Sequence, residues 1–356
     1  MPNKFTKKTL DIAQPLMTTY THHAHLLSIL GVHEETKPWI YSNYIQTYTD
    51  MDLINTAWSD CYFPLPFHLR PAEICPWIFN QKLGRDFIQD NWTDFKDAVI
   101  YFIDHDTYIN AILNQYYIPN TPAFETTHFL HDVLIFGYDK EKKCVNIAEF
   151  DENYKYTTFE ISFESINDAF SNYEKCDNMD YLWGKVLLYK FEPSCIYIFD
   201  FQNIINLVKA YLDGETTEYW KFYSDKNDHY KYMRVFGIQG YTQLIDYVTT
   251  CANEGKEVRH RLFYFLFDHK RMMTLRFKYL NEIGFNFNFI NELLEIEKTS
   301  QIILNLILKY NMNNNKDIIK KIIGFIDTIK INEFKVLSEF LQIAEGLSNN
   351  EAKRRV

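Results

Sequence analysis

The chain has 356 residues, of which 47% are hydrophobic and 17% aromatic, and its formal net charge is -10. This composition is typical of a folded globular protein and excludes a disordered one. The negative charge disfavours nucleic acid and anionic membrane surfaces as partners, so an acidic partner would need a local basic patch.

The sequence contains no obvious targeting or membrane segment. No apolar run approaches the roughly 20 residues of a spanning helix, and the first residues, MPNKFTKKTLD, lack the apolar core of a signal peptide. We therefore expect a cytoplasmic protein. The cysteines agree with a reducing compartment, because they are scattered without C-x-x-C pairs and so favour reduced thiols over disulfides or a zinc site; they are Cys61, Cys75, Cys144, Cys176, Cys195 and Cys251.

The first predicted element is a helix within residues 16–31, LMTTYTHHAHLLSILG. Thr18, Thr19 and Thr21 are candidate N-caps, and Gly31 ends the helix. The start of such a helix stabilises anions, including thiolates and oxyanions. The segment is rich in histidine, but no carboxylate or thiolate stands at ligand spacing, so we predict no metal site; the histidines are His22, His23, His25 and His33.

Residues 37–85 are irregular, with many prolines and aromatic residues, and predict packed loops and short strands. Cys61 is the thiol to consider as a nucleophile. Pro64 and Pro66 follow where an activating helix would have to begin, which favours a structural cysteine. Residues 94–115 predict strand and helix, and residues 116–122 predict a loop.

A hairpin is predicted within residues 127–150, THFLHDVLIFGYDKEKKCVNIAEF. Its strands are residues 133–136 and 144–148, with a turn at residues 137–139 and a charged loop after it. A histidine at one end and a carboxylate at the other would then lie near each other on one rigid ribbon. That arrangement suits a base and the acid that orients it; the alternative is two core strands whose end residues happen to be polar.

Residues 156–169 predict a strand and then a helix that begins near Phe163, and a boundary follows at residues 173–179. We therefore divide the chain into domains 1–175 and 176–356. A short strand is predicted at residues 194–199. Apolar residues at three- and four-residue spacing then predict a mainly helical second half, with helices at 203–212, 243–251, 258–283, 289–310 and 316–347.

The segment 256–278 is basic within an acidic protein. Its seven basic residues, against two acids, are Lys256, Arg259, Arg261, Lys270, Arg271, Arg276 and Lys278. Such a run is typical of a solvated helix face. The alternative is a dock for an acidic partner or a phosphate arm, with Arg259, Arg261, Lys270 and Arg271 as the binding residues.

The residues HDVLIFGYD, followed by VNIAEF, resemble the H-x-V-x-x-x-G-Y-D and I-A-D-P segments of the papain-like, bacteriocin-processing cysteine peptidase domains. The likeness is closer to their biosynthetic relatives of the butirosin acyltransferase and closthioamide amide synthase types. It covers roughly the first half of the chain. The resemblance implies an α+β fold, in which a papain-like domain with its N-terminal helix packed on an antiparallel sheet precedes a mainly helical domain.

The resemblance also implies site residues. The base falls on His131, with His128 as a neighbour, and the acid falls on Glu149, with Asp151 as the fallback if the register slips. Family members carry a cysteine at the start of the helix, nine residues before the end of a C-x-x-x-x-L-x-x-I-L pattern, and that position is Thr21 here.

A threonine hydroxyl is a much poorer nucleophile than a thiolate, because almost none of it is ionised at neutral pH. Thr21 is therefore a slower nucleophile, a natural loss of catalysis, or an engineered replacement that traps an inactive state. The sequence leaves these three interpretations open.

The function implied is an amide-forming acyltransferase of specialised, nonribosomal metabolite biosynthesis. An acyl or peptidyl carrier protein would present a thioester on its phosphopantetheine arm, as part of the substrate rather than a resident cofactor, and a small amine would accept the acyl group. Two alternatives stay open: an inactive papain-like module that binds the acyl intermediate, and a leader-cleaving peptidase.

Overall fold

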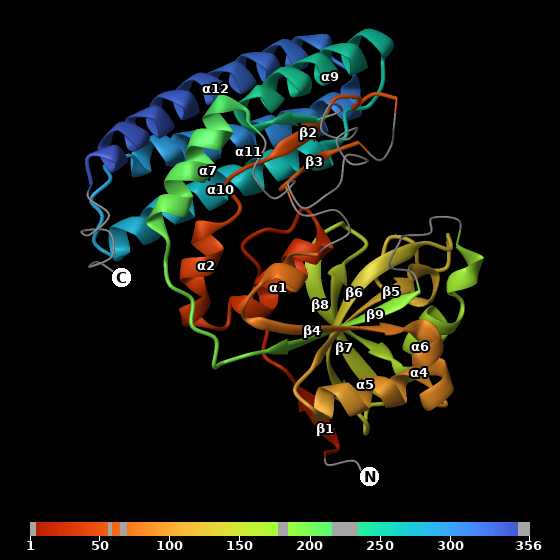
Figure 1. Cartoon of the computed structure of the whole chain (residues 1–356). Helices are drawn as coiled ribbons and strands as arrows, with labels where there is room; N and C mark the ends of the chain where they lie inside the picture. The colour runs from red at the N-terminus through yellow and green to blue at the C-terminus, as the bar shows by residue number, and fades with distance from the viewer. Residues whose placement is uncertain (1–4, 56–58, 65–69, 177–183, 216–233, 348–356) are drawn as a thin grey trace, which may run out of the picture. The chain divides into compact units, whose positions relative to one another are not determined.

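The computed structural model in Figure 1 describes residues 5–55, 59–64, 70–176, 184–215 and 234–347. Contacts group the chain into two units, Met1–Thr36 with Phe67–Ile196 and Lys37–Pro66 with Tyr197–Val356. The fold is α+β, with an antiparallel sheet and a helical C-terminal region. The chain passes from one unit to the other three times, after residues 36, 66 and 196. The single boundary predicted between residues 175 and 176 therefore does not separate these two units.

The first unit is built on an antiparallel sheet, seven-stranded among the described residues, with the order β4-β9-β5-β6-β7-β8 and β1 paired with β6. The strands are β1 (Lys7–Thr9), β4 (Ile78–Gly84), β5 (Tyr108–Asn114), β6 (Leu130–Asp139), β7 (Cys144–Phe150), β8 (Tyr156–Ser162) and β9 (Lys185–Phe191). The helices are α1 (Thr21–Leu30), α3 (Pro71–Ile74), α4 (Arg85–Asn91), α5 (Phe95–Asp104) and α6 (Phe163–Ser171), with short 3-10 helices at η1 (Glu34–Thr36), η2 (Gln115–Tyr117) and η3 (Tyr173–Lys175).

Helix α1 confirms the predicted N-terminal helix. Its apolar residues are almost wholly buried, and Gly31 follows as the C-cap. The predicted threonine caps are wrong: Thr21 is the first helical residue, and the N-cap is Tyr20, whose side chain makes no capping hydrogen bond. The start of the helix is therefore held by its surroundings and not by a local cap.

The hairpin is confirmed as β6 and β7, but its turn is not where we predicted it. Gly137 lies inside β6, next to a bulge between Ile135 and Gly137, and the chain turns after Asp139. A Cβ atom at Gly137 would lie 2.7 Å from the side-chain oxygen of Asn146 and 3.0 Å from the carbonyl oxygen of Lys8. The glycine thus permits the close approach of β1 and β7 and does not turn the chain.

The predicted strand at residues 194–199 is wrong, and the strand β9 just before it was missed. Ile196 and Ile198 are 87% and 81% exposed, whereas Val186, Leu187 and Leu188 are buried. A strand buried on both faces has no alternation of apolar and polar residues. The apolar alternation of residues 194–199 led to the prediction, although Ile196 and Ile198 are exposed and only Phe199 is buried, with its ring 5.9 Å from that of Tyr279.

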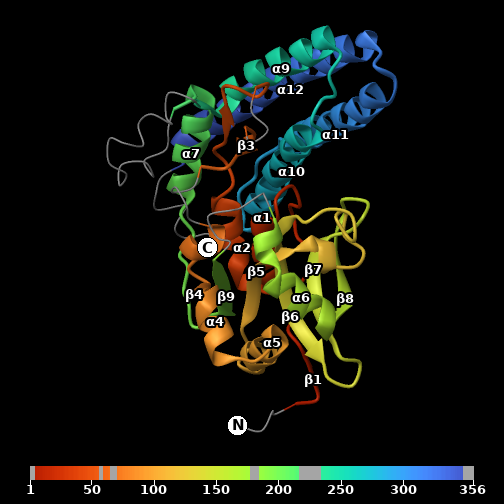
Figure 2. The ribbon, with the colours of Figure 1, turned by 90° about the vertical axis from the view of Figure 1, so that its right-hand side faces the viewer.

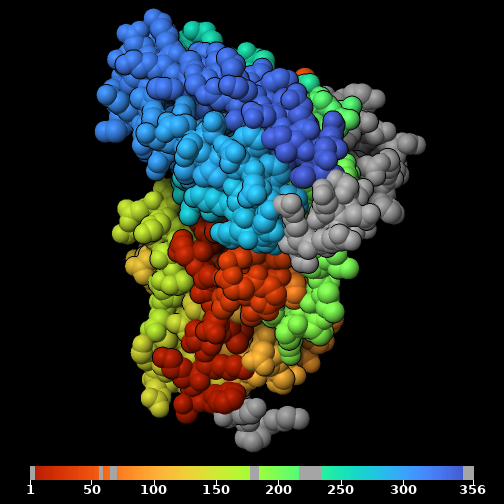
Figure 3. All heavy atoms as spheres, turned by 90° about the vertical axis from the view of Figure 1, so that its left-hand side faces the viewer, coloured from red at the N-terminus to blue at the C-terminus, as the bar shows by residue number. Residues whose placement is uncertain are grey.

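The second unit is mainly helical, as predicted. It contains α2 (Lys37–Ser42), α7 (Phe201–Asp213), α9 (Gly240–Glu254), α10 (His260–Glu282), α11 (Ile290–Asn313), α12 (Lys316–Glu345) and the 3-10 helix η6 (Gly237–Gln239). Figures 1 and 2 show the long helices running side by side, and α11 and α12 cover much of the face of this unit seen in Figure 3.

A small antiparallel sheet completes this unit, with the order β10-β2-β3. Its strands are β2 (Tyr48–Asp50), β3 (Cys61–Tyr62) and β10 (Arg234–Phe236). In the part of the chain that the structure describes, no helix combines the length and the apolar character that crossing a membrane requires.

Candidate active site

The structure brings His131 and Glu149 together. Nδ1 of His131 lies 2.9 Å and 2.8 Å from the two carboxylate oxygens of Glu149, which is fully buried, while 28% of the His131 side-chain surface is exposed. The contact follows from the local fold, because both residues lie on adjacent strands of one hairpin. With Nδ1 bound to the carboxylate, Nε2 is the nitrogen left for proton transfer.

The charge of Glu149 tunes this imidazole. Burial by itself lowers the pKa of His131, but the charge and hydrogen bond of Glu149 outweigh burial and hold the pKa above the ordinary value of 6.5. The histidines of α1 behave in the opposite way: burial, with a smaller contribution from Arg70, lowers the pKa of His23 to about 3, and burial also lowers the pKa values of His22 and His25. His131 is therefore the histidine of this region best suited to exchange a proton near neutral pH.

The alternatives to this pair have other roles. Asp151 lies in the turn after β7, where its side chain accepts hydrogen bonds from the amides of Asn153 and Lys155. His128 pairs with the side chain of Asn114 at 3.0 Å.

Thr21 has a different partner from the one that the resemblance implies. Its hydroxyl is 3.4 Å from Oδ2 of Asp132 and donates to it, and Thr21 is only 7% exposed. Among the described residues, Thr21 makes no hydrogen bond to His131.

The alternation of β6 explains this difference. Successive side chains of a strand point to opposite faces, so His131 and Asp132 leave β6 on opposite sides. Val133 and Ile135, which share the face of His131, lie in the core cluster with α5 and α6. Asp132 instead faces Thr21 at the start of α1.

Asp132 is the centre of a second buried cluster, which sequence reasoning missed. Its Oδ2 atom also pairs with Nη1 of Arg70 at 3.0 Å, and its backbone carbonyl lies 3.2 Å from Nε2 of His25. The other ring nitrogen of His25 lies 2.8 Å from the Tyr156 hydroxyl. The aspartate beside the histidine in HDV was the one available signal; Arg70 and Tyr156 had none, because they lie far away in the sequence.

A cavity of about 280 Å³ adjoins His131. The residues that line it are Gln115, Pro122, Ala123, Thr126, Thr127, Phe129, His131, Phe150 and Tyr154. Thr21 and Asp132 are not among these lining residues, so the cavity belongs to the His131 face of β6.

Cys61, the alternative nucleophile, lies in the other unit. It is 3% exposed, its Sγ atom is 3.4 Å from the Thr49 hydroxyl, and burial raises the pKa of its thiol. A buried thiol with a raised pKa is a structural cysteine rather than a nucleophile, as the prolines after it indicated.

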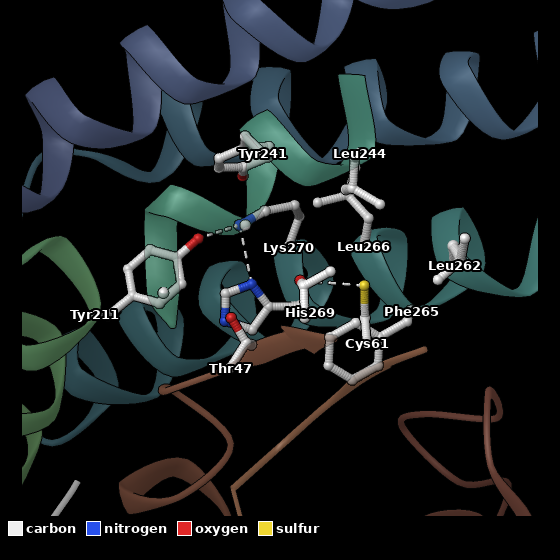
Figure 4. Close-up of a pocket in the computed structure, with 13 residues that line it drawn as sticks. Thr47, Cys61, Tyr211, Tyr241, Leu244, Leu262, Phe265, Leu266, His269 and Lys270 are labelled. Carbon is white, nitrogen blue, oxygen red and sulfur yellow. Dashed lines mark hydrogen bonds between the residues drawn. The ribbon is translucent and has the colours of Figure 1, made fainter. Parts of the chain in front are cut away.

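The predicted basic dock is not a single surface. Lys270 is buried beside Glu333, with 2.6 Å between Nζ and Oε1, and Figure 4 shows it among Tyr211, Tyr241 and His269. Arg276 is also buried, with 0% exposure. These two positions are a correction to the predicted dock, because a carrier protein or phosphate arm cannot reach them.

The other predicted dock residues differ in their surroundings. Arg259 donates to the carbonyl oxygens of Ser59 and Leu53, which occupies its guanidinium group. Arg261 pairs with Asp60 at 2.6 Å and stays 48% exposed, and Arg271 is exposed. Only Arg261 and Arg271 of the four present a surface charge.

Within the described ranges, no three or more histidine, cysteine, aspartate or glutamate residues are grouped so as to hold a metal ion. No protein-family model matches this sequence, and no curated protein matches it in a sequence search.

Proposed function

We propose that this chain is an acyltransferase that moves an acyl group from a carrier-protein thioester to an amine, in a papain-like first unit and in the service of specialised, nonribosomal metabolism. The observation that supports the proposal is the His131–Glu149 pair on the wall of a cavity. The thioester donor and the carrier rest on the family resemblance of the hairpin residues.

The geometry favours direct transfer without a covalent enzyme intermediate. The amine nitrogen attacks the thioester carbonyl and forms the C–N bond, while Nε2 of His131 takes the proton of the amine. The C–S bond then breaks, and the leaving thiol recovers that proton from His131. Glu149 holds the imidazole in the correct tautomer and stabilises the imidazolium that forms.

Thr21 is not needed in this sequence of steps. Its hydroxyl is engaged by Asp132, and Asp132 is in turn paired with Arg70. A threonine hydroxyl is scarcely ionised at neutral pH and attacks only when a base removes its proton. His131, the proposed base, points to the opposite face of β6, so it does not activate Thr21 for attack on the thioester.

The test uses an N-acetylcysteamine thioester with a primary amine, and measures thiol release together with the mass of the amide. We expect His131→Ala to lower kcat/KM at least about 100-fold, the usual contribution of a general base. His128→Ala is the matched control and should keep most of the activity, as should Thr21→Ala. Undiminished turnover by His131→Ala would exclude the proposed role of this histidine.

A second candidate function is a binding module without catalysis, and the engaged hydroxyl of Thr21 favours it. Such a module would bind the thioester without consuming it. Calorimetric binding of the thioester to the wild type, with no amide formed over many hours, would favour this candidate.

A further inference from the structure

The cavity beside His131 has an uncharged lining. Apart from His131, the described residues around it carry amide, hydroxyl, aliphatic or aromatic side chains, and none is an aspartate, glutamate, lysine or arginine. A cationic group placed in such a cavity loses its hydration without gaining an ion pair, and an anionic group finds only His131 as a partner, so burying either charge is costly.

Three aromatic residues share this lining with His131, and the rings of two of them contact the imidazole. The ring of Phe129 stacks on His131, with centroids 5.9 Å apart and planes at 28°, and the ring of Phe150 is tilted against it at 6.1 Å. Phe129 is 39% exposed and Tyr154 is 69% exposed, so much of their ring surface is open to a ligand. Aromatic rings gain both from burial and from stacked or edge contacts with other rings.

The backbone presents Tyr154 in an uncommon way. Its φ is 58°, the left-handed region that bulky residues rarely adopt. The turn is held by hydrogen bonds from the Tyr154 amide to the carbonyl of Asp151 and from the Asp151 amide to the carbonyl of Lys155. Backbone strain of this kind persists only where the surrounding structure enforces it, and it concentrates at ligand-binding sites.

The size of the cavity limits what it holds. Its volume of about 280 Å³ is just below the roughly 300–1,000 Å³ that is typical of ligand pockets. A single ring on a short linker suits it better than a long aliphatic chain does.

We infer that this cavity receives the acyl group of the substrate and selects an uncharged acyl group that carries one aromatic ring. This inference rests on the proposed function, since it assigns the cavity to the acyl donor. The ring lies among Phe129, Phe150 and Tyr154, and the thioester carbonyl then lies toward Nε2 of His131.

The experiment compares three N-acetylcysteamine thioesters with one amine acceptor. Phenylacetyl tests the aromatic group, β-alanyl carries an ammonium, and succinyl carries a carboxylate. We expect kcat/KM for phenylacetyl to exceed both others by at least about 10-fold, the scale on which a pocket separates unlike groups. Equal or better turnover of a charged thioester overturns the inference and leaves the proposed function in place.

Variants locate the preference in the cavity. Tyr154→Ala and Phe129→Ala should each reduce the phenylacetyl preference several-fold. Phe87→Ala is the matched control, because Phe87 is a 48% exposed aromatic residue on α4 of the same unit that does not line the cavity. A preference that all three variants change equally overturns the inference.

If no thioester reacts, the proposed function fails, and binding still decides the inference. Calorimetry then compares phenylacetamide with succinamate on the wild type and Tyr154→Ala. Binding of phenylacetamide that Tyr154→Ala weakens supports an aromatic site. Equal binding of succinamate, or no binding of either compound, contradicts it.

Discussion

The pKa of His131 is raised mainly by Glu149, with a smaller contribution from the charge of Asp132. Because the pKa of His131 is raised in the folded protein, its pair with Glu149 contributes stability that is fully present below the ordinary value of 6.5 and is lost as the pH rises through the folded value. The same shift means that the imidazole becomes a base only at a pH above 6.5. The pair is therefore most stable where the imidazole is protonated, whereas the role proposed for His131 as a base requires the neutral imidazole and so a higher pH.

Replacing Glu149 by glutamine tests this account. The amide keeps the shape of the side chain but removes the charge, while the burial that lowers the pKa of His131 stays. We expect the midpoint of His131 titration, followed by NMR of its ring protons, to fall below 6.5. Any activity should then reach its plateau at lower pH.

Asp151→Asn is the control for that measurement, because Asp151 is the neighbouring carboxylate engaged only in its own turn. It should leave the midpoint where it is in the wild type. If Asp151→Asn shifted the titration midpoint of His131 and Glu149→Gln did not, Asp151 and not Glu149 would be the residue that sets the pKa of His131.

Residue identity alone could indicate His131 and Glu149 but not the partner of Thr21. The two strands of a hairpin are local, so the pairing of their side chains follows from short-range sequence. The partner of Thr21 depends on which face of β6 the helix α1 covers, 111 residues along the chain. Packing determines which face α1 covers, and the residues next to Thr21 in the sequence do not indicate it.

At the scale of elements, α10 shows how a basic segment becomes part of a core. Nζ of Lys270 donates to the Tyr211 hydroxyl, to Nδ1 of His269 and to Glu333 at 3.0, 2.9 and 2.6 Å. The other oxygen of Glu333 accepts the hydroxyls of Tyr211 and Tyr241 at 2.8 and 2.6 Å. This network joins α7, α9, α10 and α12 with its charges paired.

Removing one charge from this network should destabilise the protein much more than removing both charges. We expect Lys270→Met to lower the free energy of unfolding by about 3–5 kcal/mol, because it leaves Glu333 charged and buried. The double variant Lys270→Met, Glu333→Gln should recover much of that loss, since it leaves no charge and keeps an acceptor for the tyrosines. Urea unfolding measures both values.

The matched control is an exposed pair on α12. Lys320 and Asp317 lie 3.0 Å apart with side chains 79% and 75% exposed, so Lys320→Ala should change the free energy of unfolding by less than about 1 kcal/mol. If Lys270→Met lowered the free energy of unfolding no more than Lys320→Ala does, the buried ion pair would be no more important for stability than an exposed one.

The periodicity of apolar residues predicted the long helices and the hairpin, but not the surface that each charge reaches. Lys270, Arg271 and Arg276 are chemically alike, yet only Arg271 is exposed. A helix that is buried around most of its circumference has no distinct polar stripe in its sequence. The pattern therefore does not show which of its cations are exposed. Their burial is decided by the neighbouring helices and by the acceptors these supply.

At the scale of the whole molecule, the segment 37–66 belongs to the helical unit by its contacts. Arg276 of α10 donates to the carbonyl oxygens of Tyr41 and Tyr44 at 2.8 and 3.1 Å, and His269 lies 2.9 Å from the carbonyl oxygen of Ile45. Strand β10 pairs with β2 of the same segment. The buried guanidinium would lose these acceptors if the segment were absent.

A fragment of residues 176–356, the predicted second domain, should therefore not fold as a cooperative unit. We expect thermal unfolding followed by circular dichroism to show a broad transition. A fragment in which residues 37–66 precede residues 197–356 through a glycine-serine linker should regain a sharp one. A sharp transition for residues 176–356 alone would show that the inserted segment is dispensable.

The sequence by itself determined the elements whose contacts are local: the N-terminal helix, the β6–β7 hairpin with its histidine and carboxylate, and the helices of the second half. The physical reason is that apolar periodicity and turns act within a few residues of each other. Only the tertiary structure decided the position of β9 between β4 and β5, the burial of Lys270, the grouping of residues 37–66 and the bond from Thr21 to Asp132. These features depend on which surfaces of segments far apart in the sequence pack together and become buried from water. A local sequence pattern does not contain that information.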